Sequence, residues 1–256
     1  MTVRSPQTLF IGNNIVRLND VDSTNSFALS LLRNTEMEEG AVITAHAQTL
    51  GRGQRGNTWF SEPGKNITCS ILLKPNFLNI NLQFDLTRAI ALGLSDLLND
   101  LLPSSAINIK WPNDIIADGK KIAGILIENV INGTRVSTSV VGIGLNVNQQ
   151  HFGIDAAHAV SISQLAGKEF VVEEVQQQLF SHVEARYLQL RAGKLDKLRS
   201  EYHARLFKLD IIANYTDYKN TFEAKLESVS NEGILFLRDL EGKERRFGFH
   251  EVGMMF

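Results

Sequence analysis

The stretch Gln48-Thr49-Leu50-Gly51-Arg52-Gly53-Gln54-Arg55-Gly56-Asn57-Thr58-Trp59 decides how the rest of this chain is interpreted. Its glycines let the backbone approach a ligand and adopt positive φ, and consecutive N–H groups in such a loop form a nest for an anion. The arginines add a planar, fixed positive charge that suits carboxylate and phosphate, and the tryptophan offers a flat apolar face. This composition predicts a loop that holds an anionic ligand with a ring. The plain alternative is a solvated basic surface loop.

The loop matches no standard phosphate motif. A P-loop of the form G-x-x-x-x-G-K-[ST] does not occur in the chain. Gly51, Gly53 and Gly56 have the spacing of G-x-G-x-x-G, but residues 58–64 do not open the apolar helix that a dinucleotide fold requires. The ligand must therefore be inferred from the other motifs.

Four further segments accompany this loop in a fixed order. They are Asp22-Ser23-Thr24-Asn25, Lys110-Trp111-Pro112-Asn113-Asp114, residues 120–128 with Lys121-Ile122-Ala123-Gly124, and residues 140–148 with Gly142-Ile143-Gly144-Leu145-Asn146. In this order the five segments resemble the biotin protein ligase family, over about residues 15–150 and more weakly beyond. The resemblance implies an ATP-dependent enzyme that makes biotinyl-5′-AMP from biotin and ATP. It then transfers biotin to a lysine of a biotin carboxyl carrier protein, part of acetyl-CoA carboxylase or a related carboxylase.

The resemblance also implies an α+β fold, with a catalytic domain similar to class II aminoacyl-tRNA synthetases and a small C-terminal SH3-like β-barrel. With 256 residues and 43% hydrophobic content, the chain can bury a substantial core. Apolar patterns predict strands over residues 15–18, 41–47 and 67–73, and several between 107 and 147. Helical spacing is expected over residues 23–32, 82–102, 172–190 and 195–206. Asp118-Gly119 and Asn132-Gly133 are hairpin dipeptides.

After Phe207 the pattern changes to short strands separated by Asn, Asp and Gly turns, which is typical of a small barrel. We therefore expect a catalytic domain over residues 1–206 and a barrel over 207–256. Because the ligase motifs begin by Asp22, we expect this chain to lack the DNA-binding helix-turn-helix domain that some family members carry. With a net charge of −2, no binding to DNA is expected.

The surroundings of the chain follow from its composition. No window approaches the ~18 uninterrupted apolar residues of a membrane helix. The single cysteine, Cys69, lies in an apolar run and is expected to be a buried core thiol. These features favour a reducing, cytoplasmic setting without membrane partners. A sheet edge could pair two subunits into a homodimer, but no sequence pattern decides the oligomeric state.

Joining biotin to ATP brings two anions together, so cations and oriented N–H groups are needed where they meet. Arg52 is the first candidate, supported by N–H groups around Gly51 and Gly53; the alternative is a surface ion pair. The resemblance assigns Lys121 to the biotin carboxylate and then to the phosphoryl oxygens of the adenylate. Lys120 is expected to be a solvated neighbour. Arg52 and Lys121 are thus the two predicted catalytic residues.

The ureido ring of biotin has one acceptor and two N–H donors, which require a short polar cluster in an apolar pocket. Hydroxyl and amide groups of Ser23, Thr24 and Gln48 suit it, although Ser23 and Thr24 could instead cap a helix. Gly124 and Gly142 are expected to clear space for the ring and tail. The residues assigned to biotin are Ser23, Thr24, Asn25, Gln48, Arg52, Gly53, Gln54, Lys121, Gly124 and Gly142.

For ATP, Trp59 is expected to cover the adenine, although it could be a core residue, and Asn146 to contact adenine or ribose. Asp114 is the candidate ligand for Mg²⁺, which prefers oxygen donors. The six histidines are scattered and make no case for a transition-metal site. The residues assigned to ATP are Gly51, Arg52, Arg55, Trp59, Asn113, Asp114 and Asn146.

One departure from the family affects the loop. Its common form reads G-R-G-R-x-G-[RK]-x-W, whereas this chain has Gln54 at the fourth place and Asn57 at the seventh. Glutamine keeps hydrogen-bonding capacity but lacks the charge, so we expect a weaker hold on the adenylate. Two rival functions are a lipoate–protein ligase and a non-catalytic biotin- or nucleotide-binding module.

Overall fold

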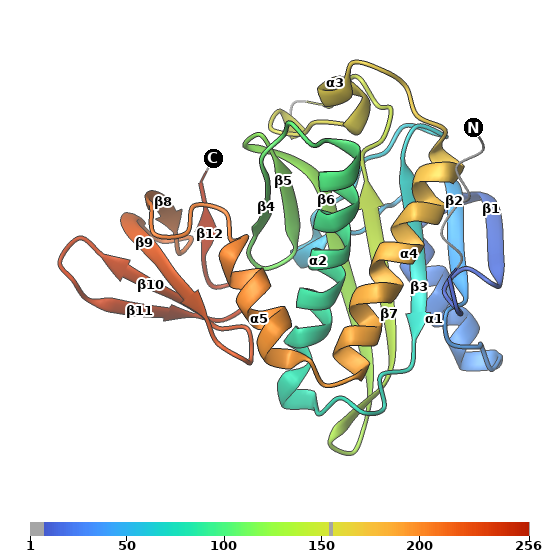
Figure 1. The fold of residues 1–256 in the computed structure, drawn as a ribbon, viewed down its shortest axis with the longest axis horizontal. Helices are drawn as coiled ribbons and strands as arrows, with labels where there is room; N and C mark the ends of the chain where they lie inside the picture. Colours follow the sequence, from blue (N-terminus) through green and yellow to red (C-terminus); the bar gives the residue numbers. More distant parts are fainter. Residues whose placement is uncertain (1–7, 154–155, 256) are drawn as a thin grey trace.

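Two β-sheets carry the fold of the computed structural model, which describes residues 8–153 and 156–255 (Figure 1). The larger sheet has seven strands in the order β1-β2-β3-β7-β6-β5-β4. Only its β1–β2 pair is parallel among the pairs described, and the other neighbours are antiparallel. In chain order the strands are β1 (Ile15–Val21), β2 (Val42–Gln48), β3 (Ile67–Leu73), β4 (Ile107–Lys110), β5 (Asp114–Ala117), β6 (Lys120–Asn132) and β7 (Arg135–Leu145).

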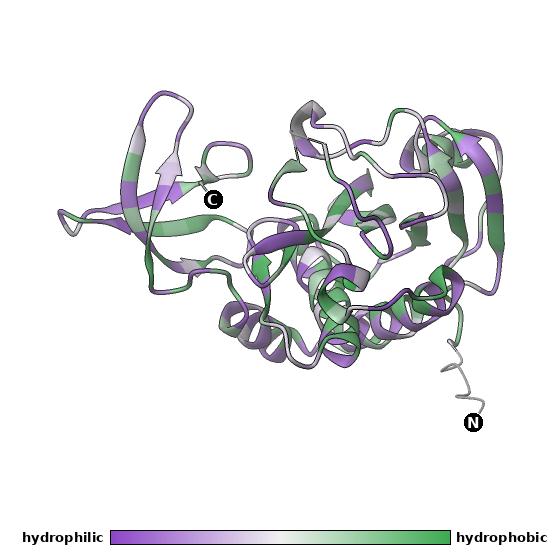
Figure 2. Ribbon diagram, turned by 90° about the horizontal axis from the view of Figure 1, so that it is seen from above, coloured by the Kyte–Doolittle hydropathy of each residue, from purple (hydrophilic) through white to green (hydrophobic). Residues whose placement is uncertain are grey.

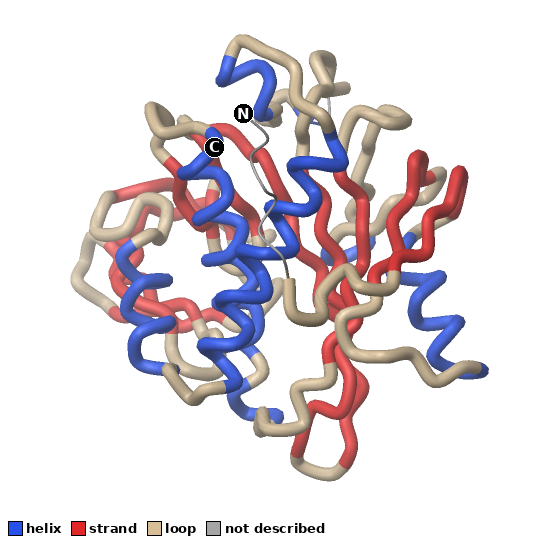
Figure 3. Tube along the Cα trace, turned by 45° about the vertical axis from the view of Figure 1, so that its right-hand side comes forward, coloured by secondary structure: helices blue, strands red, loops and turns tan. Residues whose placement is uncertain are grey.

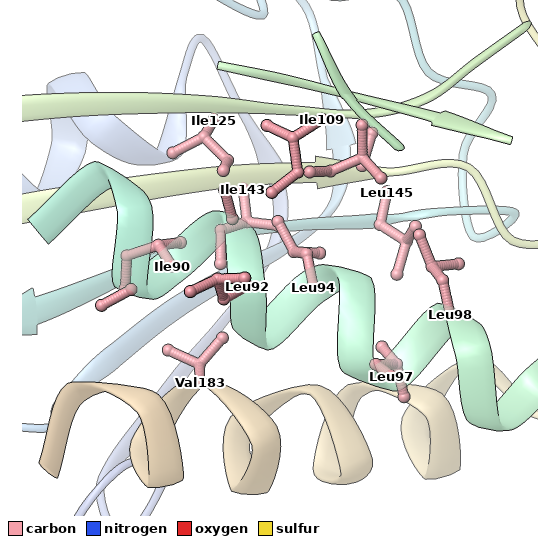
Figure 4. Close-up of a cluster of buried hydrophobic side chains, with 14 of the residues drawn as sticks. Ile90, Leu92, Leu94, Leu97, Leu98, Ile109, Ile125, Ile143, Leu145 and Val183 are labelled. Atoms are coloured by element: carbon pink, nitrogen blue, oxygen red, sulfur yellow. The ribbon is translucent and has the colours of Figure 1, made fainter. Parts of the chain in front are cut away.

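Helices α2 (Phe84–Leu101) and α4 (Val172–Arg191) run along one face of this sheet, and the smaller sheet lies beside it (Figures 1 and 2). Gly93 of α2 has no Cβ, and a Cβ there would lie 2.9 Å from Cα of Val183, so the two helices pack closely. Figure 4 shows the apolar layer between these helices and the sheet. Its labelled members are Ile90, Leu92, Leu94, Leu97, Leu98, Ile109, Ile125, Ile143, Leu145 and Val183.

Helix α1 (Thr24–Asn34) packs on the opposite face. Successive strand residues point to opposite faces: Val42 and Ile71 belong to the main core, whereas their neighbours Ile43 and Leu72 pack with Ala28 of α1. The sheet is therefore covered on both sides here, which places the start of α1 beside the middle of the sheet.

The remaining helical segments are short. They are η1 (Gln54–Gly56), η2 (Ile80–Leu82), α3 (Ile162–Ala166) and α5 (Leu195–Ala204). None of the described helices combines the length and the apolar composition that a membrane span needs.

The smaller sheet is antiparallel, with the order β11-β10-β9-β8-β12. Its arrangement fits an SH3-like domain, but the strand pairs of the described residues leave β11 and β12 as edges and do not close a barrel. The boundary near residue 206 stays a prediction. The strands are β8 (Ile212–Thr216), β9 (Thr221–Val229), β10 (Leu235–Asp239), β11 (Glu244–Phe247) and β12 (Gly253–Met254).

Buried contacts fix the smaller sheet to the larger unit. Arg88 of α2, only 1% exposed, donates to the carbonyl of Ser230. The indole Nε1 of Trp111 donates to the carbonyl of Gly233 at 3.0 Å, and the Trp111 ring stacks on Phe249 at 5.7 Å between centroids. The turn between β4 and β5 is therefore in direct contact with the C-terminal sheet.

The element predictions hold with small shifts. The strand over 67–73 is confirmed, and the helix predicted from residue 82 begins at Phe84 because η2 precedes it. The Asp118-Gly119 turn is confirmed, with φ of 48° and 79°. The second turn lies between Asn132 and Arg135, so it is shifted by one residue, and its hairpin projects beyond the helices (Figure 3). Cys69 is buried as expected, and burial raises the pKa of its thiol to about 12.

Candidate active site

The five motifs meet around one cavity of about 250 Å³. Its walls come from the Gly/Arg loop over residues 48–59, the start of α1, the β4–β5 turn and strands β6 and β7. Tyr218, His250 and Met254 of the C-terminal sheet and its loops complete the lining. The predicted site residues that line this cavity are Ser23, Thr24, Asn25, Gln48, Arg52, Gly53, Gln54, Trp59, Asn113, Asp114, Lys121, Gly124 and Gly142.

Three predicted residues are placed differently. Gly51 lines a second, neighbouring hollow. Asn146 is 2% exposed, and its Nδ2 donates to the carbonyl of Val160 at 3.0 Å, so it holds the chain after β7 and does not line the cavity. The side chain of Arg55 lies outside what the structure describes.

A polar cluster lies where α1 begins. The backbone N–H of Thr24 donates to Gln48 Oε1 at 2.8 Å, and the Thr24 hydroxyl donates to the same oxygen at 3.1 Å. The hydroxyl of Ser70, which is fully buried on β3, lies 2.8 Å from Thr24 Oγ1 and 2.6 Å from Asn25 Oδ1. Ser23 occupies the N-cap position, yet its side chain makes no capping bond. The Ser23 hydroxyl therefore does not cap the helix in this structure.

Asn25 is anchored under this cluster. Its Nδ2 donates to the carbonyl of Leu126 at 3.1 Å and to Glu128 Oε2 at 2.9 Å. A Cβ on Gly142 would lie 2.4 Å from Asn25 Oδ1. The absence of a side chain at Gly142 therefore makes room for the Asn25 amide. We had expected this space to hold the ring and tail of the ligand.

The guanidinium of Arg52 is held by a carboxylate. Nη2 lies 2.9 Å from Glu128 Oε1, and Nη1 lies 3.2 Å from Glu128 Oε2 and 3.3 Å from the hydroxyl of Ser26. In this conformation Arg52 makes the ion pair that was the alternative to a catalytic role. Direct contact of its guanidinium with a substrate anion stays a prediction.

Positive charge gathers at the β4–β5 turn. Nζ of Lys121 lies 2.7 Å from Asp114 Oδ1 and 5.7 Å from the ring centroid of Trp59. Lys110 also lines the cavity, and it faces Asp114 across the β4–β5 pair. Burial lowers the pKa of Lys110 to about 8, against the opposing attraction of Asp114. Lys121 is therefore paired with Asp114, and a second lysine, Lys110, lines the same end of the cavity.

Trp59 lies on a floor without side chains. Gly124 and Gly144 are directly opposite each other in the β6–β7 register. A Cβ on Gly144 would lie 2.3 Å from Cε2 of Trp59, and one on Gly124 would lie 3.3 Å from Cζ3. The indole Nε1 is buried without a hydrogen-bond partner. The flat contact explains why both strands carry glycine at these positions.

Besides the lining from the C-terminal sheet, the sequence did not assign to the site Ser70, Lys110, Glu128 and Gly144. Lys110 and Gly144 lie within the family motifs, and Glu128 is the last residue of the segment 120–128. Their positions in the sequence could therefore have indicated that they belong to the site. Ser70 lies in an apolar run and carries no such signal. No cluster of three or more His, Cys, Asp or Glu side chains that could hold a metal ion occurs in residues 8–153 and 156–255.

Comparison with known proteins assigns the family. The model of the "Biotin/lipoate A/B protein ligase family" matches residues 18–146. The chain is 30% identical over 242 residues to "Bifunctional ligase/repressor BirA" of Bacillus subtilis (strain 168), covering 92% of this chain and 73% of the relative. It is 37% identical over 127 residues to "Biotin--[acetyl-CoA-carboxylase] ligase" of Paracoccus denitrificans, covering 49% and 51%.

A solved structure agrees in fold. "Biotin protein ligase from Aquifex aeolicus in complex with biotin and ATP" superposes with a TM-score of 0.78 at 24% identity, covering 95% of this chain and 99% of that one. The matched residues 18–146 contain every motif around the cavity. The chain therefore belongs to the biotin/lipoate A/B protein ligase family and, within it, to the biotin protein ligases.

Proposed function

We propose that the cavity binds biotin and ATP together and that the chain works as an ATP-dependent biotin–protein ligase. The reaction makes biotinyl-5′-AMP and pyrophosphate, after which a lysine of a carrier protein displaces AMP. The observation that carries this proposal is the pairing, in one cavity, of a neutral polar cluster and a cluster of lysines. The two ends match the two ends of biotin, which has a neutral ureido ring and an anionic carboxylate.

The polar end suits a ureido group. Thr24 and Gln48 present a hydroxyl and an amide with both donor and acceptor capacity, held in place by Ser70 behind them. Lipoate has no ureido group and could not replace the water that it would displace from these polar groups, a loss of roughly 1–3 kcal/mol for each buried group. This argument favours biotin over the rival ligand of the family.

The cationic end suits adenylation. A biotin carboxylate oxygen attacks the α-phosphorus of ATP, the new C–O–P link forms, and the bond to pyrophosphate breaks. Lys121 is our candidate for holding both anions, because Asp114 keeps its Nζ at the cavity wall. Such a reaction needs positioning and charge stabilisation more than covalent help from the protein. Two lysines at the place where both anions would meet favour adenylation over binding of a single anion.

For the nucleotide, we propose that Trp59 provides the stacking surface and that its unpaired Nε1 and the Asn113 amide supply polar contacts. We keep the other ATP residues proposed from the sequence as candidates. For Gly51 and Asn146 we propose an indirect role, in which they shape the backbone around the cavity.

Asp114 fits Mg²⁺ that arrives with ATP. It is a single carboxylate at the cavity wall, and Mg²⁺ typically uses one or two protein carboxylates together with substrate phosphates and waters. When bound, the ion would neutralise phosphate charge. Asp114 would then exchange part of its contact with Lys121 for the metal.

The partner and setting are proposed from the reaction and the composition. A biotin carboxyl carrier protein would present its lysine at the cavity. One buried cysteine and no possible intrachain disulfide fit a reducing compartment, for which we propose the cytoplasm. A homodimer would use an edge of the larger sheet, which has β1 and β4 as its outer strands, and light scattering would test it.

The decisive assay is pyrophosphate release from ATP on addition of biotin or lipoate. We expect release with biotin only. Lys121→Ala should abolish most of it, whereas the exposed neighbour variant Lys120→Ala should retain it. Release with lipoate only would favour the rival ligase, and release with neither would favour a binding module.

A further inference from the structure

Glu128 on β6 holds two residues of the site at once. One carboxylate oxygen accepts from Arg52 Nη2 at 2.9 Å, and the other accepts from Arg52 Nη1 at 3.2 Å and from Asn25 Nδ2 at 2.9 Å. Arg52 belongs to the Gly/Arg loop, and Asn25 is 3% exposed at the base of the polar cluster. Glu128 therefore bridges a loop residue and a buried residue of the biotin end.

A continuous set of polar contacts runs from this carboxylate into the polar cluster. Asn25 Oδ1 accepts from Ser70, whose oxygen lies 2.8 Å from Thr24 Oγ1, and Thr24 donates to Gln48. The groups we assign to the ureido ring are thus linked to Arg52 through Glu128. A shift of the loop cannot occur at Arg52 without breaking this chain of contacts at its outer end.

The Gly/Arg loop lines two hollows. Arg52, Gly53 and Gln54 line both the cavity of about 250 Å³ and a second hollow of about 390 Å³. Bonds from Gly53 N–H to the Asn57 carbonyl and from Trp59 N–H to the Gly51 carbonyl lie within the loop. Arg52 makes the side-chain hydrogen bonds that connect the loop to the rest of the chain. This holds for the side chains described between Gly51 and Thr58, which do not include that of Arg55.

We propose that Glu128 is a positioning residue that latches the Gly/Arg loop over the cavity through Arg52 and so retains biotinyl-AMP. This role rests on the proposed ligase function. The latch acts on the opening of the loop, and the bonds made and broken in adenylation do not involve it. It also gives this chain a means of retention that does not depend on Gln54, where the family more often has arginine.

The size of the effect follows from the exposure of the pair. The Arg52 and Glu128 side chains are 44% and 25% exposed, and such half-exposed ion pairs contribute up to about 1 kcal/mol. Two-point geometry and a shared Asn25 contact place this pair at the upper end of that range. Loss of the latch should therefore speed release of biotinyl-AMP about fivefold.

The test uses the full chain loaded with biotin and ATP and then freed of excess substrate. The dissociation rate of biotinyl-AMP is measured, together with single-turnover pyrophosphate release and biotinylation of a bystander protein. Glu128→Gln should release biotinyl-AMP about fivefold faster and label the bystander faster, and the change in the release rate should exceed any change in single-turnover adenylation. Glu244→Gln is the matched control, because Glu244 pairs with Arg246 at 2.8 Å on β11, away from the cavity.

Three outcomes would overturn the latch. These are a release rate in Glu128→Gln equal to that of the wild type, a loss confined to the adenylation step, or a large fall in the melting temperature that accounts for the faster release. A double variant Arg52→Ala/Glu128→Gln should release no faster than Arg52→Ala alone, and additive effects would also refute the pair as the latch. If the wild-type chain forms no biotinyl-AMP, the proposed function itself fails and this role for Glu128 fails with it.

Discussion

Lys110 gives the sharpest prediction, because its charge should depend on pH near neutrality. Lys110 lines the cavity and pairs with Asp114 in the β4–β5 register, and burial lowers its pKa to about 8. About nine in ten Lys110 side chains are then charged at pH 7 and about one in ten at pH 9. If the charged form assists adenylation, the rate should fall about tenfold between these two pH values.

The effect of Lys110 titration on the free energy of unfolding has the opposite direction, so unfolding would not explain the expected fall in rate. The folded pKa of Lys110 lies below the value of about 10.4 expected for an unfolded lysine. Between pH 8 and about 10.4 the unfolded state binds more protons, so this group makes folding more favourable as the pH rises. The cost of burying the charged lysine is present below pH 8 and is relieved above it. A fall in activity in this window is therefore not explained by destabilisation from Lys110.

The assay is biotin-dependent pyrophosphate release at saturating substrates from pH 6.5 to 9.5, so that the carrier lysine plays no part. Lys110→Arg should remove the fall, because a guanidinium stays charged above pH 12. Lys110→Ala should lower the rate about 10²–10³-fold at pH 7, the typical effect of removing one stabilising group from a charged transition state. Lys120→Arg is the exposed control. Identical pH profiles for the wild type and Lys110→Arg would refute the reasoning.

Four further outcomes are expected. Lys121→Ala should fold but lose about 2–4 kcal/mol of transition-state stabilisation, measured as biotin-dependent pyrophosphate release. Thr24→Val should weaken biotin binding by roughly 1–3 kcal/mol and ATP binding less; calorimetry showing a defect only for ATP would reassign this residue. Gln54→Arg should slow biotinyl-AMP dissociation about tenfold if a charge-assisted bond adds ~1.4 kcal/mol, and an unchanged rate would mean that the side chain at this place does not retain the adenylate. Asp85→Ala should lower the free energy of unfolding by about 3–5 kcal/mol in urea, because it leaves the buried Arg88 without its carboxylate.

Local patterns predicted most elements of the fold. The run over β3 is mostly apolar, is buried along its length and is bounded by turn residues, so its limits could be predicted. Helix α3 was missed because its five residues are too few to display helical spacing. Its capping box, Ser161 with Gln164, was nevertheless present in the sequence and was the available signal. The open five-stranded sheet was not distinguishable from a closed barrel, since closure depends on pairing between distant strands.

The site was predictable to the extent that it lies in motifs. The loop, Thr24 and Gln48 could be proposed from residue type, and Lys121 from the resemblance to the family; the roles of all of them stay predictions. The partners of these residues could not be proposed. Ser70 reaches Asn25 only because of how α1 packs on β3, and Glu128 meets Arg52 only through the folding of the loop onto β6. Such contacts depend on register and packing, which one sequence does not specify.

The two ends of the cavity differ in whether their polar groups already have hydrogen-bond partners, and this difference affects which parts rearrange when ligands bind. At the polar end Thr24 and Gln48 already have partners, so biotin meets an ordered surface. At the other end the Trp59 ring covers the Gly124–Gly144 floor with its Nε1 buried and unpaired. An unpaired buried donor costs roughly 1–3 kcal/mol, and a ligand acceptor would recover that free energy. Rearrangement on binding should therefore concentrate in the loop that carries Trp59, while the start of α1 changes little.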